Sequence, residues 1–425
     1  MSIQSAISPV PRRALPEQGN GWGQLKGIMR DYAQDDVDWR RGRSPLYVFF
    51  ADPEVLEVAR EAYAMFMSEN ALGPAAFPSL KRMESEVVEM SLDLLHAPEG
   101  AAGSMTSGGT ESIFLAVKAA RDWARAERPE ITEPELLLPY SAHPAFNKAA
   151  HYLGVKARRV QLRADFTADP AAMAEGVTAS TIMMVGSAVA YPQGVFDPIE
   201  ALAAVAQERG LWMHVDACVG GYTAPFVAKL GYPVPAFDLG VPGVCSLSAD
   251  LHKYGFAAKG ASTILYAEER RHAFQFYEFT DWPKGLYRTP SFAGTRPGGA
   301  VAAAWAVLNH LGMDGYLRLN RQLMEMRDAY IAGIEAIPEL RIWGKPGIGI
   351  VTFGSNVLNI FAVAERMAQR GWYPNVVAKP QAIHLMLSLA HEPARGEYLE
   401  DLAACVNDVM ELGGHIESSI RPVTY

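Results

Sequence analysis

The chain has 425 residues, of which 49% are hydrophobic and 20% are charged. This length is enough for two or three globular units, and the apolar content excludes a mainly disordered chain, which could not offset the entropy of ordering. The net charge of −9 argues against non-specific nucleic-acid binding, although a locally basic pocket could still take an anionic substrate.

Compartment and membrane association can be predicted from three features. Cys218, Cys245 and Cys405 are far apart and form neither a disulfide framework nor a zinc-ligand spacing, which fits a reducing compartment. The longest apolar run, residues 300–308, is about half of the ~20 residues that a membrane-spanning helix needs. No secretory signal follows the arginines near the N-terminus, so we expect a cytoplasmic protein without a membrane-spanning segment.

The N-terminal part is predicted to contain a loose arm followed by helices. Residues 1–22 are rich in Ser, Pro and Gln and lack periodicity. Apolar residues recur with helical spacing over 52–70 and again over 80–95, with Gly73, Pro74 and Pro78 between them. We assign residues 1–75 to an N-terminal arm with helices.

Strands and helices then alternate, after a turn-rich stretch at 103–110. Helices are predicted at 111–128, 145–153 and 199–209, and short apolar strands at 135–139, 181–185, 211–215, 243–247 and 262–266. This alternation favours an α/β fold with a mostly parallel sheet covered on both faces, assigned to a large domain of residues 76–298.

The pattern changes after about residue 298 to that of a smaller α+β unit, assigned to residues 299–425. Its predicted helices are 299–311, 315–335, 362–370 and 398–412, and its predicted strands are 348–353, 357–360 and 382–388.

Lys253 and Asp216 each follow or end a predicted strand, where α/β sheets place reactive groups. A lysine forms Schiff bases when desolvation or nearby cations lower its pKa, although a single loop lysine is more often simply solvated. A buried carboxylate needs a partner, and a protonated pyridine nitrogen is suitable, with a helix cap or core ion pair as the alternative. His214 shares a strand face with Asp216 and the two could resemble a pair of metal ligands. The sequence shows no third ligand, so we do not expect a metal site.

The stretch from Thr106 to Glu111 can approach a phosphate closely, because its residues are small and a helix N-terminus follows. It is neither a Walker loop nor a dinucleotide fingerprint, and an ordinary loop with Thr110 as helix cap is the alternative. His143 follows the strand 135–139, where an imidazole could stack on an aromatic ring or be an ordinary polar loop residue.

Taken in order, these motifs resemble those of the fold-type I pyridoxal-phosphate enzymes of the group II decarboxylase superfamily, and among them the sphingosine-1-phosphate lyases. The resemblance extends from about residue 42 to residue 316. The matching stretches are KRMESEVVEM, TSGGTES, SAHPAFNKAA, GSAVAYPQGVFDP, HVDACVGG, SLSADLHKYGFAAKG and GTRPGG. The resemblance implies a large domain with a mostly parallel seven-stranded sheet, a small C-terminal α+β domain, pyridoxal 5'-phosphate as cofactor, and a homodimer.

The resemblance also implies roles in cofactor binding. Lys253 would hold the cofactor covalently, Asp216 would pair with its ring nitrogen, and His143 would stack on its ring. The cofactor phosphate would be held by Gly108, Gly109, Thr110 and His252, and in the neighbouring subunit by Thr295.

Further positions are implied for the substrate. Tyr191 resembles the catalytic tyrosine, and the phosphate and amine ends of the substrate would meet Tyr47, Asn70 and Lys259. The family usually shows Asn-x-Leu-His-Pro near the substrate phosphate, whereas this chain has Gly73 in place of that histidine. One hydrogen-bonding partner is thereby lost, a change of about 1–3 kcal/mol for a buried group.

The reaction expected from the resemblance is retro-aldol Cα–Cβ cleavage of a phosphorylated long-chain base to an aldehyde and phosphoethanolamine. Tyr191 or released Lys253 would carry the protons. An amino-acid decarboxylase and a β-hydroxy-amino-acid aldolase are the enzymatic alternatives, and a non-catalytic binding scaffold is the third.

Overall fold

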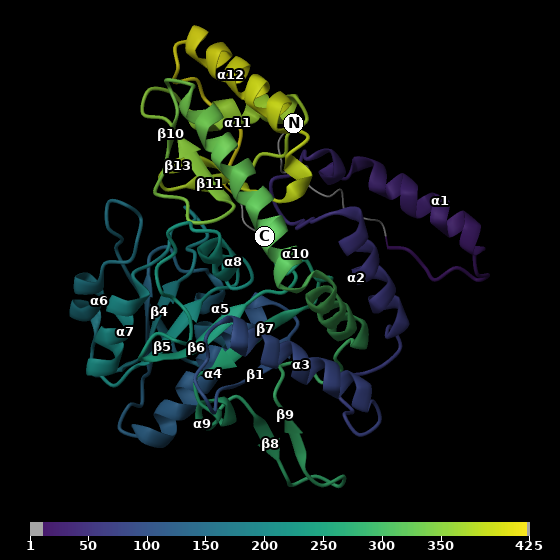
Figure 1. The fold of residues 1–425 in the computed structure, drawn as a ribbon, viewed down its shortest axis with the longest axis vertical. Coiled ribbons are helices and arrows are strands. Elements are labelled where there is room, and N and C mark those ends of the chain that lie inside the picture. Colours follow the sequence, from purple (N-terminus) through teal and green to yellow (C-terminus); the bar gives the residue numbers. More distant parts are fainter. Residues whose placement is uncertain (1–11, 423–425) are drawn as a thin grey trace.

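A seven-stranded sheet forms the centre of the larger part of the protein (Figure 1). The structure is a computed structural model that describes residues 12–422. The strands of this sheet are β1 (Ala102–Thr106), β2 (Glu135–Pro139), β3 (Lys156–Val160), β4 (Thr181–Ser187), β5 (Trp212–Asp216), β6 (Val244–Ala249) and β7 (Ser262–Tyr266). Their order across the sheet is β1-β7-β6-β5-β4-β2-β3.

One strand of this sheet runs against the others. Strands β6, β5, β4, β2 and β3 are parallel neighbours, whereas β7 pairs antiparallel with both β1 and β6. The ladder between β6 and β7 ends at the pair Ala249↔Thr263, and residues 250–261 join these two adjacent strands. The predicted mostly parallel, seven-stranded sheet is confirmed.

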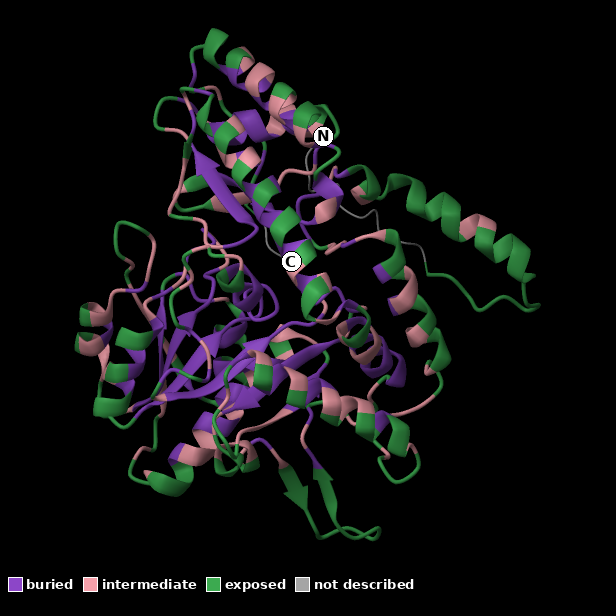
Figure 2. Cartoon of the chain, viewed as in Figure 1, coloured by how far each residue is buried: buried purple, intermediate pink, exposed green. Residues whose placement is uncertain are grey.

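Helices cover both faces of the sheet. Strand side chains alternate between the two faces, and apolar side chains on each face pack against helices. Leu136, Leu138 and Trp212 pack with helices α4 (Gly109–Glu127) and α5 (Ala145–Leu153) on one face. Leu137 and Met213 point to the other face, which carries α7 (Ile199–Glu208) and α8 (Ala224–Lys229). Figure 2 shows the sheet as a buried layer between exposed helix surfaces. The remaining elements of this part are α6 (Pro170–Gly176), α9 (Glu269–Ala273), β8 (Tyr277–Phe279) and β9 (Tyr287–Thr289).

The N-terminal helices meet the long helix α10 (Gly298–Glu335). Helix α2 (Pro53–Met65) is capped by Asp52, whose carboxylate accepts a hydrogen bond from the Val55 backbone N–H at 2.9 Å. It packs with α3 (Pro78–Leu94) on α10. Helix α1 (Trp22–Tyr32) has no buried residue and extends away from the body (Figure 2). Short turns of 3-10 helix lie at Ala33–Asp35, Trp39–Arg41 and Leu389–His391. The predicted loose arm lies partly outside the described residues, and residues 12–21 contain no helix or strand.

The C-terminal part is the small α+β unit that was predicted. An antiparallel sheet has the order β10-β11-β13-β12. Its elements are β10 (Arg341–Ile342), β11 (Ile350–Gly354), β12 (Val376–Ala378), β13 (Gln381–Met386), α11 (Ile360–Gln369) and α12 (Arg395–Glu411). The expected break near residue 312 is present inside α10, where Gly312 has φ 55° and ψ −170°.

Two predictions of local structure are wrong. Residues 357–360 are not a strand, because the Asn359 side chain accepts a hydrogen bond from the Phe361 N–H at 3.1 Å and caps α11. The turn-rich stretch at 103–110 contains most of β1, which forms because pairing with β7 outweighs the low strand propensity of Gly103 and Ser104.

The domain limits near residues 75 and 298 stay predictions. Within residues 12–422, no helix has both the length and the apolar content to cross a membrane.

Candidate active site

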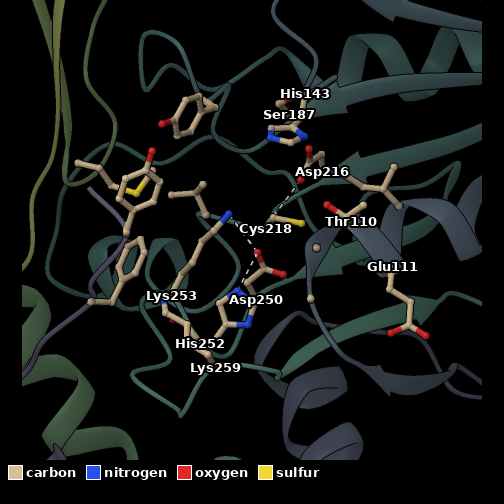
Figure 3. Close-up of a pocket in the computed structure, with 18 of the residues that line it drawn as sticks. Thr110, Glu111, His143, Ser187, Asp216, Cys218, Asp250, His252, Lys253 and Lys259 are labelled. Carbon is tan, nitrogen blue, oxygen red and sulfur yellow. Dashed lines mark hydrogen bonds and ion pairs between the residues drawn. The ribbon is translucent and has the colours of Figure 1, made fainter. Parts of the chain in front are cut away.

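A cavity of about 510 Å³ lies where the parallel strands of the large sheet end (Figure 3). His143 follows β2, Ser187 ends β4, Asp216 ends β5 and Lys253 follows β6, and all four line the cavity. Because the carboxyl ends of parallel strands meet at one edge, side chains distant in sequence converge there. The opposite wall contains side chains from the segment before α2 and from β13, namely Leu46, Tyr47, Phe49 and Met386.

The Lys253 amine points toward a carboxylate, but not toward that of Asp216. Its Nζ lies 3.0 Å from Oδ2 of Asp250, which is 3% exposed (Figure 3). Burial alone would lower the lysine pKa, but the Asp250 carboxylate raises it above its ordinary value. Burial would raise the pKa of Asp250, yet Lys253 and His252 together hold it below its usual range. The pair is therefore ionised.

Asp216 lies at the centre of this edge. It is paired in register with Ser187 of β4 and Ser248 of β6, and its Oδ1 accepts a hydrogen bond from the Cys218 N–H at 3.1 Å. The strand fixes its position, because both neighbouring strands are hydrogen-bonded to it. This is the placement expected for an acid that holds a cationic ring nitrogen.

The glycine loop leaves no room for a side chain at Gly109. A Cβ atom there would lie 2.8 Å from Sγ of Cys218 and 2.9 Å from Oδ2 of Asp250. Gly108, which precedes the helix, makes no side-chain cap, and the first residues of α4 line the cavity. A bare backbone at the start of a 19-residue helix is suited to hold a phosphate.

His143 and His252 both lie beside Lys253 and are held in the neutral form. Burial lowers the pKa of each ring. Nδ1 of His143 accepts a hydrogen bond from the Ala145 N–H at 3.2 Å, so its neutral ring carries the proton on Nε2. Nδ1 of His252 and Oδ1 of Asp250 are buried without hydrogen-bond partners. Polar groups of this kind normally have partners, which indicates that a ligand fills this end of the cavity.

Tyr191 lines the cavity from the loop after β4, and a residue of the C-terminal unit holds it there. The His384 ring lies 4.7 Å from the Tyr191 ring, at 35° between their planes. Nδ2 of Asn375 lies 2.8 Å from His384 Nδ1, and Nε2 of His384 lies 2.9 Å from the Tyr191 carbonyl oxygen. Burial lowers the pKa of His384 to about 4, so the neutral ring accepts at Nδ1 and donates from Nε2.

Lys259 and Tyr47 lie at the rim of the cavity. Nζ of Lys259 donates to the His252 carbonyl oxygen at 3.3 Å and lies 5.2 Å from the centre of the Phe49 ring. Partial desolvation and the Lys253 charge lower the pKa of Lys259 to about 8. Tyr47 has a positive φ of 69°, which is uncommon for a residue with a side chain.

Two predicted site residues lie together but outside this cavity. Nδ2 of Asn70 donates to Oγ1 of Thr295 at 3.3 Å, and Oδ1 of Asn70 accepts from the Arg296 N–H at 3.1 Å. Neither Asn70 nor Thr295 lines the cavity of its own chain. The other predicted residues all do, and they are Tyr47, Gly108, Gly109, Thr110, His143, Tyr191, Asp216, His252, Lys253 and Lys259.

Comparison with known proteins identifies the family. The sequence profile described as "Pyridoxal-dependent decarboxylase conserved domain" matches residues 53–356. The chain belongs to the pyridoxal-dependent decarboxylase family. It is a pyridoxal-phosphate-dependent lyase, as the resemblance of its motifs implied.

Several relatives carry the name of one branch of the family. The chain is 41% identical to the sphingosine-1-phosphate lyase of Oryza sativa, over 97% of this chain and 77% of that protein. The solved sphingosine-1-phosphate lyase of Burkholderia pseudomallei superposes with a TM-score of 0.91 at 38% identity, over 95% of this chain and 94% of that one. A probable L-aspartate decarboxylase of Pyrococcus furiosus is 34% identical, over 85% of this chain and 93% of that protein.

The cavity fits the cofactor of this family. The bare loop at Gly109, the unpartnered polar atoms of His252 and Asp250, and Lys253 lie together at one end. Lys253 would hold the cofactor, Asp216 its ring nitrogen and the start of α4 its phosphate. When bound, the cofactor supplies an electron-accepting ring. Among the described residues, no cluster of three or more His, Cys, Asp or Glu side chains could bind a metal ion.

Some cavity residues had no signal in the sequence. Phe49 and Met386 are apolar and belong to segments far from the motifs, so only the tertiary fold brings them to the cavity. His384 acts through Tyr191, 193 residues away in the sequence. Asp250 was visible three residues before Lys253, and the turn that joins them would have been the signal.

Proposed function

We propose that this protein cleaves the Cα–Cβ bond of a phosphorylated long-chain base and releases an aldehyde and phosphoethanolamine. The observation that carries this proposal is similarity to lyases acting on sphingosine 1-phosphate over nearly the whole chain, in sequence and in structure. The alternative of a non-catalytic scaffold is disfavoured, because Lys253 and Asp216 are both present in the cavity.

The cavity contains a charged group and apolar wall that suit the two ends of such a substrate. The Lys259 amine, charged at neutral pH, is available for a phosphate group at the rim. Leu46, Phe49, Val189 and Met386 provide apolar wall that suits an alkyl chain. A substrate amine would enter beside Lys253.

Bond cleavage needs a group that removes the proton of the β-hydroxyl group. As the C–O double bond of the aldehyde forms, the Cα–Cβ bond pair moves toward Cα, which later receives a proton. Tyr191 is the candidate for these transfers, because its ring is held by His384 and lies 6.3 Å from the His143 ring. The Lys253 amine is the second candidate.

Product analysis with separate substrates tests the proposal. The cofactor-loaded protein is incubated with sphingosine 1-phosphate, with phenylserine, and with L-aspartate or L-tyrosine, and Lys253→Ala serves as the inactive control. We expect a long-chain aldehyde and phosphoethanolamine from the first substrate only. Carbon dioxide from an amino acid would instead establish decarboxylase activity. This is the second candidate function, because a probable L-aspartate decarboxylase of Pyrococcus furiosus is 34% identical. Benzaldehyde and glycine from phenylserine would establish the aldolase.

We also propose that the protein is a homodimer in which Asn70 and Thr295 complete the cavity of the neighbouring subunit. Neither residue lines the cavity of its own chain, and this supports the arrangement. The β8–β9 hairpin extends from the body and exposes Tyr277, Phe279 and Trp282, as expected of a surface that another chain covers (Figure 1). Sedimentation velocity should give twice the chain mass, and an active monomer would contradict the proposal. A cytoplasmic location stays a proposal, tested by fractionation of cells.

A further inference from the structure

We propose that Asp250 is the ion-pair partner of the Lys253 amine in the cofactor-free cavity. In this proposal Asp250 is a positioning residue that holds the charged amine whenever Lys253 is not bonded to the cofactor. The carrying observation is the 3.0 Å contact between Nζ of Lys253 and Oδ2 of Asp250, together with the near-complete burial of that carboxylate. The inference goes beyond the proposed reaction and does not depend on the substrate.

The backbone brings these two side chains together. Asp250 directly follows β6, and the Lys253 N–H donates to the Asp250 carbonyl oxygen at 3.2 Å, which closes a turn. Oδ1 of Asp250 lies against the glycine loop, 3.0 Å from the position that a Cβ on Gly109 would occupy. The strand, the turn and the glycine loop therefore fix the position of the Asp250 carboxylate.

Among residues 12–422, no other carboxylate lies within ion-pair distance of the Lys253 amine. Asp216 also raises the pKa of Lys253, but less than Asp250 does, and no contact joins its carboxylate to Nζ within the ion-pair distance. The titratable groups that face Lys253 from the elements around it are Glu111, His143, Asp216, Cys218, Asp250, His252 and Lys259. The two histidines are neutral and Cys218 has its pKa raised by burial, so Asp250 is the dominant charge at the amine.

The ion pair between Lys253 and Asp250 should affect the rate at which the cofactor attaches. An uncharged amine attacks the aldehyde carbon of the cofactor, and one water leaves as the carbon–nitrogen bond forms. An ammonium group must first give up a proton to solvent, and Asp250 disfavours that loss because it stabilises the charge. Attachment at neutral pH should therefore be slower than for a lysine without a carboxylate partner.

Competitive chemical labelling of the cofactor-free full chain tests this directly. Trace acetylation with acetic anhydride at several pH values, followed by peptide mass spectrometry, reports the reactivity of each lysine without cofactor or substrate. In the wild-type chain we expect Lys259 to react strongly above pH 8 and Lys253 to remain unreactive beyond pH 10. In Asp250→Asn the midpoint of the pH dependence of Lys253 acetylation, here called the Lys253 inflection, should move down by at least about one pH unit. This shift corresponds to about ten times more uncharged amine at a given pH.

Two further variants and a rate measurement separate charge from folding. Asp250→Glu keeps the charge and should retain the high inflection, while Asp238→Asn removes a carboxylate that pairs with His96 outside the cavity and should change nothing. The rate of cofactor association at pH 8, followed by absorbance, should rise about tenfold in Asp250→Asn alone. An unchanged Lys253 inflection in folded Asp250→Asn, checked by circular dichroism, would overturn the proposal. So would an inflection in Asp250→Glu as low as in Asp250→Asn. Because no substrate is present, neither result bears on the proposed lyase activity.

Discussion

Replacing Lys259 with alanine should separate recognition of a phosphate from the chemistry at Lys253. The Lys259 amine has one hydrogen bond, to the His252 carbonyl oxygen at 3.3 Å, and lies over the Phe49 ring at 5.2 Å. Neither contact neutralises its charge, so the amine remains available to an anion at the cavity rim.

The size of the effect follows from the exposure of the site. A hydrogen bond to a charged group contributes about 1.5–3 kcal/mol, and screening at an exposed rim reduces this to about 1–2 kcal/mol. Since about 1.4 kcal/mol is a tenfold change in binding, KM for a phosphorylated long-chain base should rise about 5- to 30-fold in Lys259→Ala. The value of kcat should stay within about twofold, because the interaction exists before and during bond cleavage.

The pH dependence gives an independent measure. The pKa of Lys259 is lowered to about 8, so its positive charge is present below pH 8 and lost as the pH rises through 8. In the wild-type enzyme KM for the phosphorylated substrate should therefore increase between pH 7 and pH 9, and a bound phosphate moves this increase upward by favouring the charged amine. In Lys259→Ala this part of the pH dependence should disappear.

The assay compares the phosphorylated substrate with the same base lacking phosphate, measured as KM or as an inhibition constant. Lys229→Ala, which removes an exposed lysine of α8 that does not line the cavity, is the matched control and should behave as wild type. Equal losses for both compounds, or an unchanged pH dependence in Lys259→Ala, would refute the reasoning and assign Lys259 to the cofactor or the fold.

Three further variants have defined expected outcomes. Gly109→Ala should lose cofactor affinity, measured by absorbance after dialysis, because the new Cβ would lie 2.8 Å from Sγ of Cys218; a fully loaded variant would contradict the phosphate-site assignment. His384→Ala should lower kcat about tenfold or more while cofactor affinity is unchanged, because its ring supports Tyr191; an unaltered kcat would show that the support is dispensable. Asp197→Ala should lower the free energy of unfolding by about 2–4 kcal/mol in thermal or denaturant unfolding, because two backbone N–H groups within 2.8 Å lose their buried acceptor; a loss below about 0.5 kcal/mol would exclude that role.

Most of the central sheet could be predicted because its strands are apolar on both faces. The strand at 262–266 and the helix at 145–153 were located to the residue, because each contains apolar residues with the spacing of its element. By contrast, β3 (Lys156–Val160) is a charged strand at the edge of the sheet, and local spacing did not indicate it. Its pairing with β2 is set by the crossover through α5, which is a tertiary property.

The site was predictable to the extent that it depends on strand ends. Lys253, Asp216 and His143 each follow or end a strand of the parallel part of the sheet, so the topology alone brings them together. Asn70 and Thr295 were assigned through resemblance, and the fold of one chain does not bring them to the cavity. His384 could not be found in this way, because it lies on β13 of the C-terminal sheet, whereas its partner Tyr191 lies in the loop after β4 of the large sheet.

The reversed direction of β7 gives one loop of the active site an unusually strict length. Other loops at this edge lead into crossover helices, where inserted residues can extend into solvent at small entropic cost. Residues 250–261 instead connect the adjacent antiparallel strands β6 and β7. The pair Ala249↔Thr263 and the hydrogen bond from the His252 N–H to the Ala261 carbonyl oxygen fix both ends of this segment. Natural insertions and deletions should therefore accumulate in the crossover loops and avoid this segment, and protein engineers who graft new substrate loops onto this scaffold should leave its length unchanged.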